Sequence, residues 1–315
     1  MPLAVIPAGA GIRFFPRLLF LCVLCALCRE IFSTNLDSLR QQLRNLQIRP
    51  KKRLGQHFVI DARVLSRIVE SAELRPDDIV VEIGAGNGGL TGPLSQKAKK
   101  VYALEIDSRL VPILRAQFDN DERVEIVPGD ALQFDYPGLH RRWGQPLKVV
   151  ANLPYEISTP ILFLFFDARE CFSLLVLMLQ KEVARRLVAA PGSKEYGPLS
   201  VWARLYTETR LLFPVSPQSF HPEPKVASAV VRLDMLPQPR IAVSDPECLR
   251  KVIQSAFTYR RKTLGNALRL GEFSRYSAGE IQEALRRAGI DPRVRGEKLF
   301  LEEFNKAALS LSSFS

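Results

Sequence analysis

A short polar motif near the middle of the chain carries the residues best suited to chemistry. Asn152, Leu153, Pro154 and Tyr155 directly follow a run of β-branched residues. An exocyclic amino group of a nucleobase is a weak nucleophile, and the amide oxygen of Asn152 can accept one of its N–H bonds and aim its lone pair. Pro154 would fix the backbone, and Tyr155 would offer a ring for stacking. The motif therefore predicts methylation of a base amino group, although four such residues in isolation form an ordinary turn.

A glycine-rich loop upstream of this motif predicts a nucleoside cofactor. Gly84, Gly86 and Gly89 lie between a β-branched run and the start of a helical pattern, where glycines let the backbone approach a nucleoside closely. Glu105 ends the next run and suits ribose hydroxyls, and Asp130 follows the third run and could accept the amino group of an adenine. Because the glycines also satisfy the dinucleotide fingerprint, the loop does not identify the cofactor.

The elements that must position these residues form an α/β pattern. Five short apolar runs separated by helix-length intervals predict parallel strands at Ile79–Ile83, Val101–Ile106, Val124–Val127, Leu147–Ala151 and Leu174–Leu179. A helix is expected before them, from Val64 to Ala72. Two extended runs, Arg210–Val215 and Ala227–Met235, should pair as an antiparallel hairpin at one edge. This layout resembles that of class I methyltransferases, with a Rossmann-like, mostly parallel seven-stranded sheet.

A small all-α domain is expected after this sheet. Residues Leu236–Arg240 (LPQPR) are typical of a linker. Helical periodicity follows over Glu247–Leu268, Ala278–Ala288 and Glu297–Leu311. We therefore predict an atypical N-terminal extension, a methyltransferase domain with a basic N-terminal arm, and a helical C-terminal domain at residues 1–35, 36–237 and 241–315.

The charge of the chain favours phosphate-rich partners or an anionic membrane surface. Forty-four Lys and Arg against 33 Asp and Glu give a formal net charge of +11 among 315 residues. Basic residues dominate an arm over Asp37–Phe58 and the helices over Arg250–Lys298, which hold twelve Lys and Arg against five acids. Five cysteines form no plausible disulfide framework, so a reducing compartment is expected. Three widely spaced histidines predict no metal site.

The first 35 residues differ from the rest of the chain. An apolar run, Leu18–Cys28, follows Arg13 and Arg17, and no acid appears before Glu30. Eleven apolar residues are too few to span a bilayer but enough for the apolar part of a signal peptide. The alternatives are an organelle transit peptide and an upstream start codon that adds a dispensable stretch.

Taken in order, the motifs resemble those of the small-subunit ribosomal RNA adenine N6,N6-dimethyltransferase family. The motifs that carry the resemblance are Leu54–Phe58 (LGQHF), Glu82–Gly88 (EIGAGNG), Leu104–Asp107 (LEID), Gly129–Ala131 (GDA), Asn152–Tyr155 (NLPY) and Phe220–Ser228 (FHPEPKVAS). The resemblance covers about Asp37–Ala308. It implies S-adenosylmethionine as the cofactor and, as the substrate, two adjacent adenosines in the loop of the 3′-terminal hairpin of small-subunit rRNA.

The resemblance also implies a role for each matching residue. The cofactor site would comprise His57, Val59, Gly84, Glu105, Asp130 and Asn152. Catalytic roles fall to Asn152, Leu153, Tyr155 and Phe220, and the rings of Tyr155 and Phe220 would hold a flipped adenine between them. We expect a monomeric cytoplasmic enzyme without a metal or a membrane anchor, acting on an assembling 30S-type particle.

Three alternatives stay open at this point. The glycine spacing also suits an NAD(P)-dependent oxidoreductase, which would leave the Asn152–Tyr155 motif unexplained. A non-enzymatic RNA-binding relative would not need an intact set of cofactor residues. An exported or membrane-tethered protein is favoured only by residues 1–35, and the sequence does not separate a bacterial from an organellar source.

Overall fold

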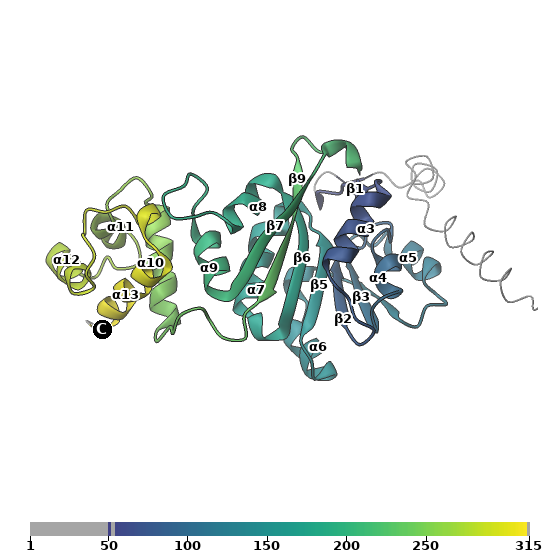
Figure 1. The fold of residues 1–315 in the computed structure, drawn as a ribbon, viewed down its shortest axis with the longest axis horizontal. Helices are drawn as coiled ribbons and strands as arrows, with labels where there is room; N and C mark the ends of the chain where they lie inside the picture. The colour runs from purple at the N-terminus through teal and green to yellow at the C-terminus, as the bar shows by residue number, and fades with distance from the viewer. Residues whose placement is uncertain (1–49, 52–53, 314–315) are drawn as a thin grey trace, which may run out of the picture.

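The computed structural model describes residues 50–51 and 54–313 (Figure 1). The predictions for the N-terminal extension, including the apolar run that holds Cys22, Cys25 and Cys28, lie outside the described residues. Most of the predicted basic arm lies outside them as well.

The β-branched runs pair into a seven-stranded sheet within the described part of the chain. Its order is β4-β3-β2-β5-β6-β9-β7. The strands are β2 (Ile79–Ile83), β3 (Lys100–Glu105), β4 (Val124–Pro128), β5 (Leu147–Asn152), β6 (Phe172–Gln180), β7 (Thr207–Val215) and β9 (Ser228–Met235). The first five of these pair in parallel, and β9 runs antiparallel to both β6 and β7. The predicted fold class and the hairpin at one edge are confirmed.

A second, two-stranded sheet lies outside the predicted pattern. Strand β1 (Phe58–Val59) pairs antiparallel with β8 (Phe220–His221), so that Val59 faces Phe220 in the register. Two-residue strands have no periodicity, and this pairing was therefore not predicted. It joins the first described residues to the loop between β7 and β9.

Helices cover both faces of the large sheet (Figure 1). Alternate residues of one strand point to opposite faces, so Val80 of β2 packs with one apolar cluster while Val81 packs with another. The helices on the Val80 face are α3 (Ala62–Ser71), α4 (Thr91–Ser95) and α5 (Val111–Gln117). Those on the Val81 face are α6 (Tyr136–Trp143), α7 (Ser158–Asp167), α8 (Lys181–Leu187) and α9 (Pro198–Tyr206). Burial on both faces explains why the central strands β2, β5 and β6 are mostly apolar.

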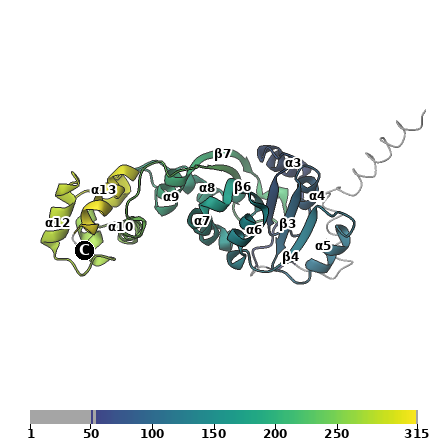
Figure 2. The same ribbon diagram turned by 90° about the horizontal axis from the view of Figure 1, so that it is seen from below.

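Four helices gather at the end of the molecule beyond α9 (Figures 1 and 2). They are α10 (Pro246–Thr258), α11 (Leu264–Leu270), α12 (Ala278–Arg287) and α13 (Leu301–Ser312). The single helix predicted over Glu247–Leu268 is wrong, because α10 ends at Thr258 and a turn over Tyr259–Lys262 separates it from α11. The last predicted helix begins later, at Leu301, after a 3-10 turn over Gly296–Lys298. The domain boundaries at residues 237 and 241 stay a prediction.

Polar contacts fix these helices to the sheet-bearing part. Tyr196 donates its hydroxyl to the carbonyl of Leu299 at 2.9 Å. Arg260 lies 2.6 Å from the carboxylate of Glu297 and donates to the carbonyl of Lys194 at 2.8 Å. The linker is held too, since Arg240 donates its amide to the carbonyl of Leu205. The two parts therefore dock through specific hydrogen bonds in addition to apolar packing.

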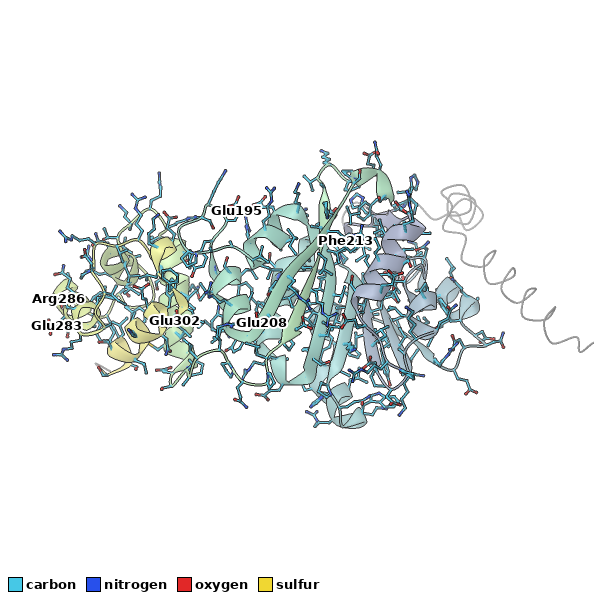
Figure 3. The ribbon with its side chains drawn as sticks, in the orientation of Figure 1. Glu195, Glu208, Phe213, Glu283, Arg286 and Glu302 are labelled. Carbon is cyan, nitrogen blue, oxygen red and sulfur yellow. The ribbon has the colours of Figure 1, made fainter. Side chains whose placement is uncertain are left out.

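Ion pairs engage much of the basic surface of the C-terminal helices. Arg286 lies 3.0 Å from Glu283 on the outer side of α12 (Figure 3). The basic residues between 250 and 298 with ion pairs of this kind are Arg250, Lys251, Arg260, Arg286, Arg287 and Arg293. Exposed pairs of this type contribute little stability and can exchange partners readily. The Lys and Arg side chains in these pairs therefore lie at the surface of the C-terminal helices.

Candidate active site

The carboxyl ends of β2, β3 and β5 meet at one edge of the sheet and bring the predicted residues together. β2 leads into the glycine loop, β3 ends at Glu105 and β5 ends at Asn152. A pocket lies at this edge, with about 730 Å³ of space between its atoms that includes open solvent at its mouth. Its lining combines these three strand ends with residues 54–59. Ligands of open α/β sheets bind at this kind of edge.

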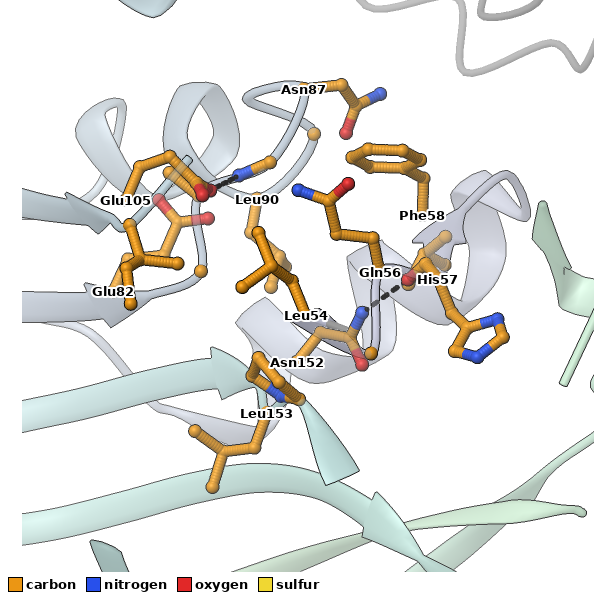
Figure 4. A pocket seen from close by; sticks show the side chains of 18 of the residues that line it. Leu54, Gln56, His57, Phe58, Glu82, Asn87, Leu90, Glu105, Asn152 and Leu153 are labelled. Carbon is orange, nitrogen blue, oxygen red and sulfur yellow. Dashed lines mark hydrogen bonds between the residues drawn. The ribbon is translucent and has the colours of Figure 1, made fainter. Parts of the chain in front are cut away.

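The glycine loop holds the carboxylate of Glu105 in place. Gly86 donates its N–H to Oε2 of Glu105 at 2.8 Å, and the amide of Asp107 donates to Oε1 at 2.8 Å (Figure 4). Gly86 has φ of +60°, and a Cβ there would lie 3.1 Å from the ring of Phe58. Burial raises the pKa of Glu105 above its ordinary value. The loop thus fixes an acceptor at the place where a ribose is expected.

Glu82 is a second acid in this pocket, and the sequence reasoning gave it no role. It is buried within β2, lines the pocket, and accepts a hydrogen bond of 2.6 Å from the hydroxyl of Thr91. Burial, together with the nearby Glu105, raises the pKa of Glu82 to about 8 although the Thr91 bond opposes the shift. Glu82 therefore keeps its proton to a higher pH than an exposed glutamate does. An acid inside an otherwise apolar strand (IVVEI) was the available signal.

Asn152 is oriented by the backbone of His57. Its Nδ2 donates to the carbonyl of His57 at 2.9 Å, which leaves Oδ1 as the acceptor of the amide (Figure 4). The imidazole of His57 points away from the side chains of Gln56 and Phe58 in Figure 4, and its Nδ1 donates to the carbonyl of Pro222 at 2.7 Å. Because a carbonyl only accepts, this nitrogen carries the proton. Nδ1 of His57 is therefore engaged by Pro222, and the carbonyl of His57 is engaged by Asn152.

The aromatic residues predicted to hold a base lie in different surroundings. Tyr155 lines the pocket at its mouth, and its hydroxyl lies 2.8 Å from Oγ of Ser228. Its ring centroid is 5.7 Å from that of His57. Phe220 is only 3% exposed, packs in the apolar cluster with Val59 and does not line the pocket. Stacking of a base on Phe220 stays a prediction.

The remaining predicted residues divide in the same way. Val59 and the buried Leu153 line the pocket. Asp130 follows the end of β4 but does not line this pocket, and its carboxylate accepts the amide of Leu132 at 2.9 Å. The sequence reasoning missed Ile106, which lines the pocket beside Glu105 and is 51% exposed. An apolar residue directly after the acid of the strand end was the signal for it.

Among the described residues, no group of three or more His, Cys, Asp and Glu side chains could hold a metal ion. Within residues 50–51 and 54–313, no helix combines the length and apolar character needed to cross a membrane. The two cysteines in these ranges, Cys171 and Cys248, are both buried as free thiols.

The strand order, the antiparallel β9 next to the edge, the glycine loop after β2 and the acid at the end of β3 define a class I methyltransferase. The pattern of one methyltransferase family, described as ribosomal RNA adenine dimethylase, matches residues 47–312. The chain belongs to this family. The predicted family and the predicted methyltransferase activity are confirmed. The alternative of an NAD(P)-dependent oxidoreductase is set aside.

Individual relatives agree with the family. The chain is 48% identical over 269 residues to ribosomal RNA small subunit methyltransferase A of Geobacter metallireducens, covering 85% of this chain and 97% of that protein. It is 45% identical over 259 residues to the protein of the same name from Magnetococcus marinus, covering 82% and 91%. Among solved structures, a dimethyladenosine transferase from Plasmodium falciparum aligns with a TM-score of 0.71 at 26% identity, over 82% of this chain and 98% of that one. The 23S rRNA methyltransferase ErmE aligns with a TM-score of 0.60 at 27% identity, over 81% and 99%.

Proposed function

We propose that this chain uses S-adenosylmethionine to dimethylate N6 of two adjacent adenosines in the loop of the 3′-terminal hairpin of small-subunit rRNA. The names of its relatives support the small subunit as the target. The observation that carries the proposal is Asn152, whose amide is held by the His57 carbonyl at the pocket where β5 ends. An acceptor fixed at this point suits an amino group that must present its lone pair to a methyl donor.

The residues of the pocket fit S-adenosylmethionine. Glu105 would accept the ribose hydroxyls, because each of its oxygens takes one backbone N–H and keeps a further lone pair. The glycine loop at Gly84 and Gly86 lets the cofactor approach the backbone. His57 and Val59 would contact the cofactor from the strand β1 side of the pocket. Asp130 would accept a hydrogen bond from the adenine amine of the cofactor, once its carboxylate shifts from the amide of Leu132. The cofactor supplies an electrophilic methyl group on a positively charged sulfur.

The residues of the chain then have simple tasks in methyl transfer. Oδ1 of Asn152 accepts an N–H of the adenine and orients the amine. Tyr155 offers its ring face to the base, and its hydroxyl stays bonded to Ser228. The methylated nitrogen is acidic enough to release its proton to water, so the site needs no strong general base. The raised pKa of Glu82 favours its neutral form, which would add no negative charge beside Glu105.

The RNA would be held by positive charge outside the pocket. The sequence around residues 250–298 supplies basic residues on the C-terminal helices, and contacts to phosphates are the usual source of affinity for RNA. We further propose that the protein acts as a monomer in the cytoplasm on an assembling 30S-type particle. The basic arm over Asp37–Phe58 would add to the affinity for RNA.

One experiment tests the function directly. The full chain is incubated with labelled S-adenosylmethionine and undermethylated small subunits, and the rRNA nucleosides are then analysed for N6,N6-dimethyladenosine. Large subunits serve as the matched control, because one structural neighbour is a 23S rRNA methyltransferase. We expect labelled dimethyladenosine only in small-subunit rRNA. Binding of the particle without methylation would support the non-enzymatic alternative, and label in large subunits would overturn the proposed target.

The Asn152→Ala variant tests the mechanism in the same assay. We expect methyl transfer to be lost, since the acceptor for the target amine is removed. The affinity for S-adenosylmethionine should also fall somewhat, because the variant removes the hydrogen bond to the His57 carbonyl. This loss should be only partial. Turnover at the wild-type rate would exclude Asn152 from the mechanism.

A further inference from the structure

Asp107 is a buried carboxylate whose partners come partly from the first described residues. Its side chain is 0% exposed. Lys51 places Nζ 3.1 Å from Oδ1, and Gln56 donates from Nε2 to Oδ2 at 3.0 Å. Arg109 donates to both oxygens, at 3.0 Å and 2.6 Å. The carboxylate therefore joins the turn after β3 to a segment about fifty residues earlier in the chain.

That segment, residues Leu54–Val59, is called the strap below. Gln56 ties it to the turn after β3. On the other side, the carbonyl of His57 accepts the amide of Asn152 at the end of β5, and Gly55 packs against Glu156 so tightly that a Cβ would lie within 2.0 Å of Oε2. Because β3 and β5 flank β2 in the sheet, the strap crosses the glycine loop that follows β2. It forms one wall of the pocket (Figure 4).

The contacts of Asp107 depend on its negative charge. The hydrogen bonds from Arg109 hold the pKa of Asp107 well below its usual range, and those from Gln56 and Lys51 add to the effect. All these partners are donors, and hydrogen bonds to an ionised acceptor are stronger than neutral ones. An asparagine would keep the shape but direct an amide N–H toward a donor. The charge, more than the size, therefore holds the strap.

We propose that Asp107 is a positioning residue for the methyl donor, because it fastens the strap to the end of β3 and so closes the wall of the cofactor pocket. This inference rests on the proposed use of S-adenosylmethionine. Asp107 itself does not line the pocket, and it acts through Gln56 and through its amide, which donates to Glu105. The effect should therefore fall on binding of the donor more than on the rate of transfer.

The test compares Asp107→Asn and Gln56→Ala in the full chain. We expect each variant to weaken S-adenosylmethionine binding by about ten- to hundredfold, the range for losing hydrogen bonds to a charged group. KM for the donor should rise by a similar factor, while kcat at saturation changes less than threefold, that is about 0.7 kcal/mol. Calorimetry and initial rates on undermethylated small subunits measure these quantities. Gln56→Ala leaves the Asp107–Arg109 contact intact, so it serves if Asp107→Asn does not fold.

Hydrogen exchange of the strap amides gives a readout that a general loss of stability would not move selectively. We expect residues 54–59 to exchange faster in both variants than in the wild type, and saturating S-adenosylmethionine to slow them. The double variant should lose no more affinity than Asp107→Asn alone, because the two changes remove the same contact.

Asp121→Asn is the matched control. Asp121 also accepts three bonds from an arginine two residues later, Arg123, and one from Ser95, but it does not contact the strap. Its variant should bind the donor as the wild type does. If Gln56→Ala and Asp107→Asn both bind and exchange like the wild type, this inference is wrong. If the wild-type protein itself binds no S-adenosylmethionine, the proposed function fails instead.

Discussion

Replacing Glu82 with glutamine tests whether the acid beneath the glycine loop is neutral. In the folded protein, burial raises the pKa of Glu82 from 4.5 to about 8. The folded state therefore holds a proton that the unfolded chain loses near pH 4.5. The stabilising contribution of Glu82 is complete below pH 4.5 and is lost progressively as the pH rises to about 8. At about 1.4 kcal/mol per pH unit, the full loss amounts to about 5 kcal/mol.

Glutamine stays neutral at every pH and keeps an acceptor for the hydroxyl of Thr91. The free energy of unfolding of Glu82→Gln, minus that of the wild type, should therefore increase by about 3 kcal/mol between about pH 5.5 and 7.5. Urea unfolding at three pH values measures this difference through the fluorescence of Trp143 and Trp202, the two tryptophans of the chain. S-adenosylmethionine is left out, because a ligand of the folded state would shift the curves.

The exposed Glu122 provides the control for this experiment. Its exchange for glutamine removes a solvated carboxylate, so the difference from the wild type should stay constant with pH. A constant difference for Glu82→Gln as well would refute the reasoning. It would mean that Glu82 is ionised in the folded state and that the pocket carries one more negative charge.

Three further predictions concern binding and packing. Gly86→Ala should weaken S-adenosylmethionine binding in calorimetry, because φ is +60° and the new Cβ would lie 3.1 Å from the Phe58 ring. The control is Gly144→Ala, which has φ of +63° but open space around its Cβ and should leave this binding unchanged. Equal affinities would contradict this. RNA affinity, measured by filter binding, should fall steeply with salt, and a flat dependence would exclude the basic surface as the grip. Phe165→Ala should lower the free energy of unfolding in urea by about 3 to 5 kcal/mol, because Phe165 is fully buried. Phe300→Ala should lower it little, because Phe300 is 52% exposed, and similar losses for the two variants would contradict this argument.

The parallel strands were predictable because burial on both faces leaves a strong signal. Runs such as Leu174–Leu179, and Ile79–Ile83 apart from Glu82, are apolar and are separated from their neighbours by helix-length intervals. The break between α10 and α11 was not predictable in this way. The apolar periodicity of α10 continues into Leu264 and Leu268, and the turn between the helices arises from tertiary contacts such as the bond from Leu264 to Val294.

The site was predictable where a residue follows a strand of the central sheet. Glu105 and Asn152 come together because the ends of neighbouring parallel strands share one edge. Residues from outside the sheet were harder to place. Neither the burial of Phe220 against β1 nor the hydrogen bond from His57 to Pro222 follows from local sequence, because both depend on a pairing of two-residue strands. The role of Asp107 likewise depends on a partner far away in the chain.

The strap also sets an order of events during synthesis. The strap is synthesised before the residues that hold it. Asp107, Asn152 and Pro222 follow the strap residues with which they form hydrogen bonds by 51, 95 and 165 residues. At about 5 to 20 residues per second, about 8 to 33 seconds pass before the last of them is made. A nascent chain therefore cannot complete the hydrogen bonds of the strap until Pro222 has left the ribosome. Fragments that end before Pro222 should lack the bond that holds the imidazole of His57, and their strap amides should exchange faster than those of the full chain.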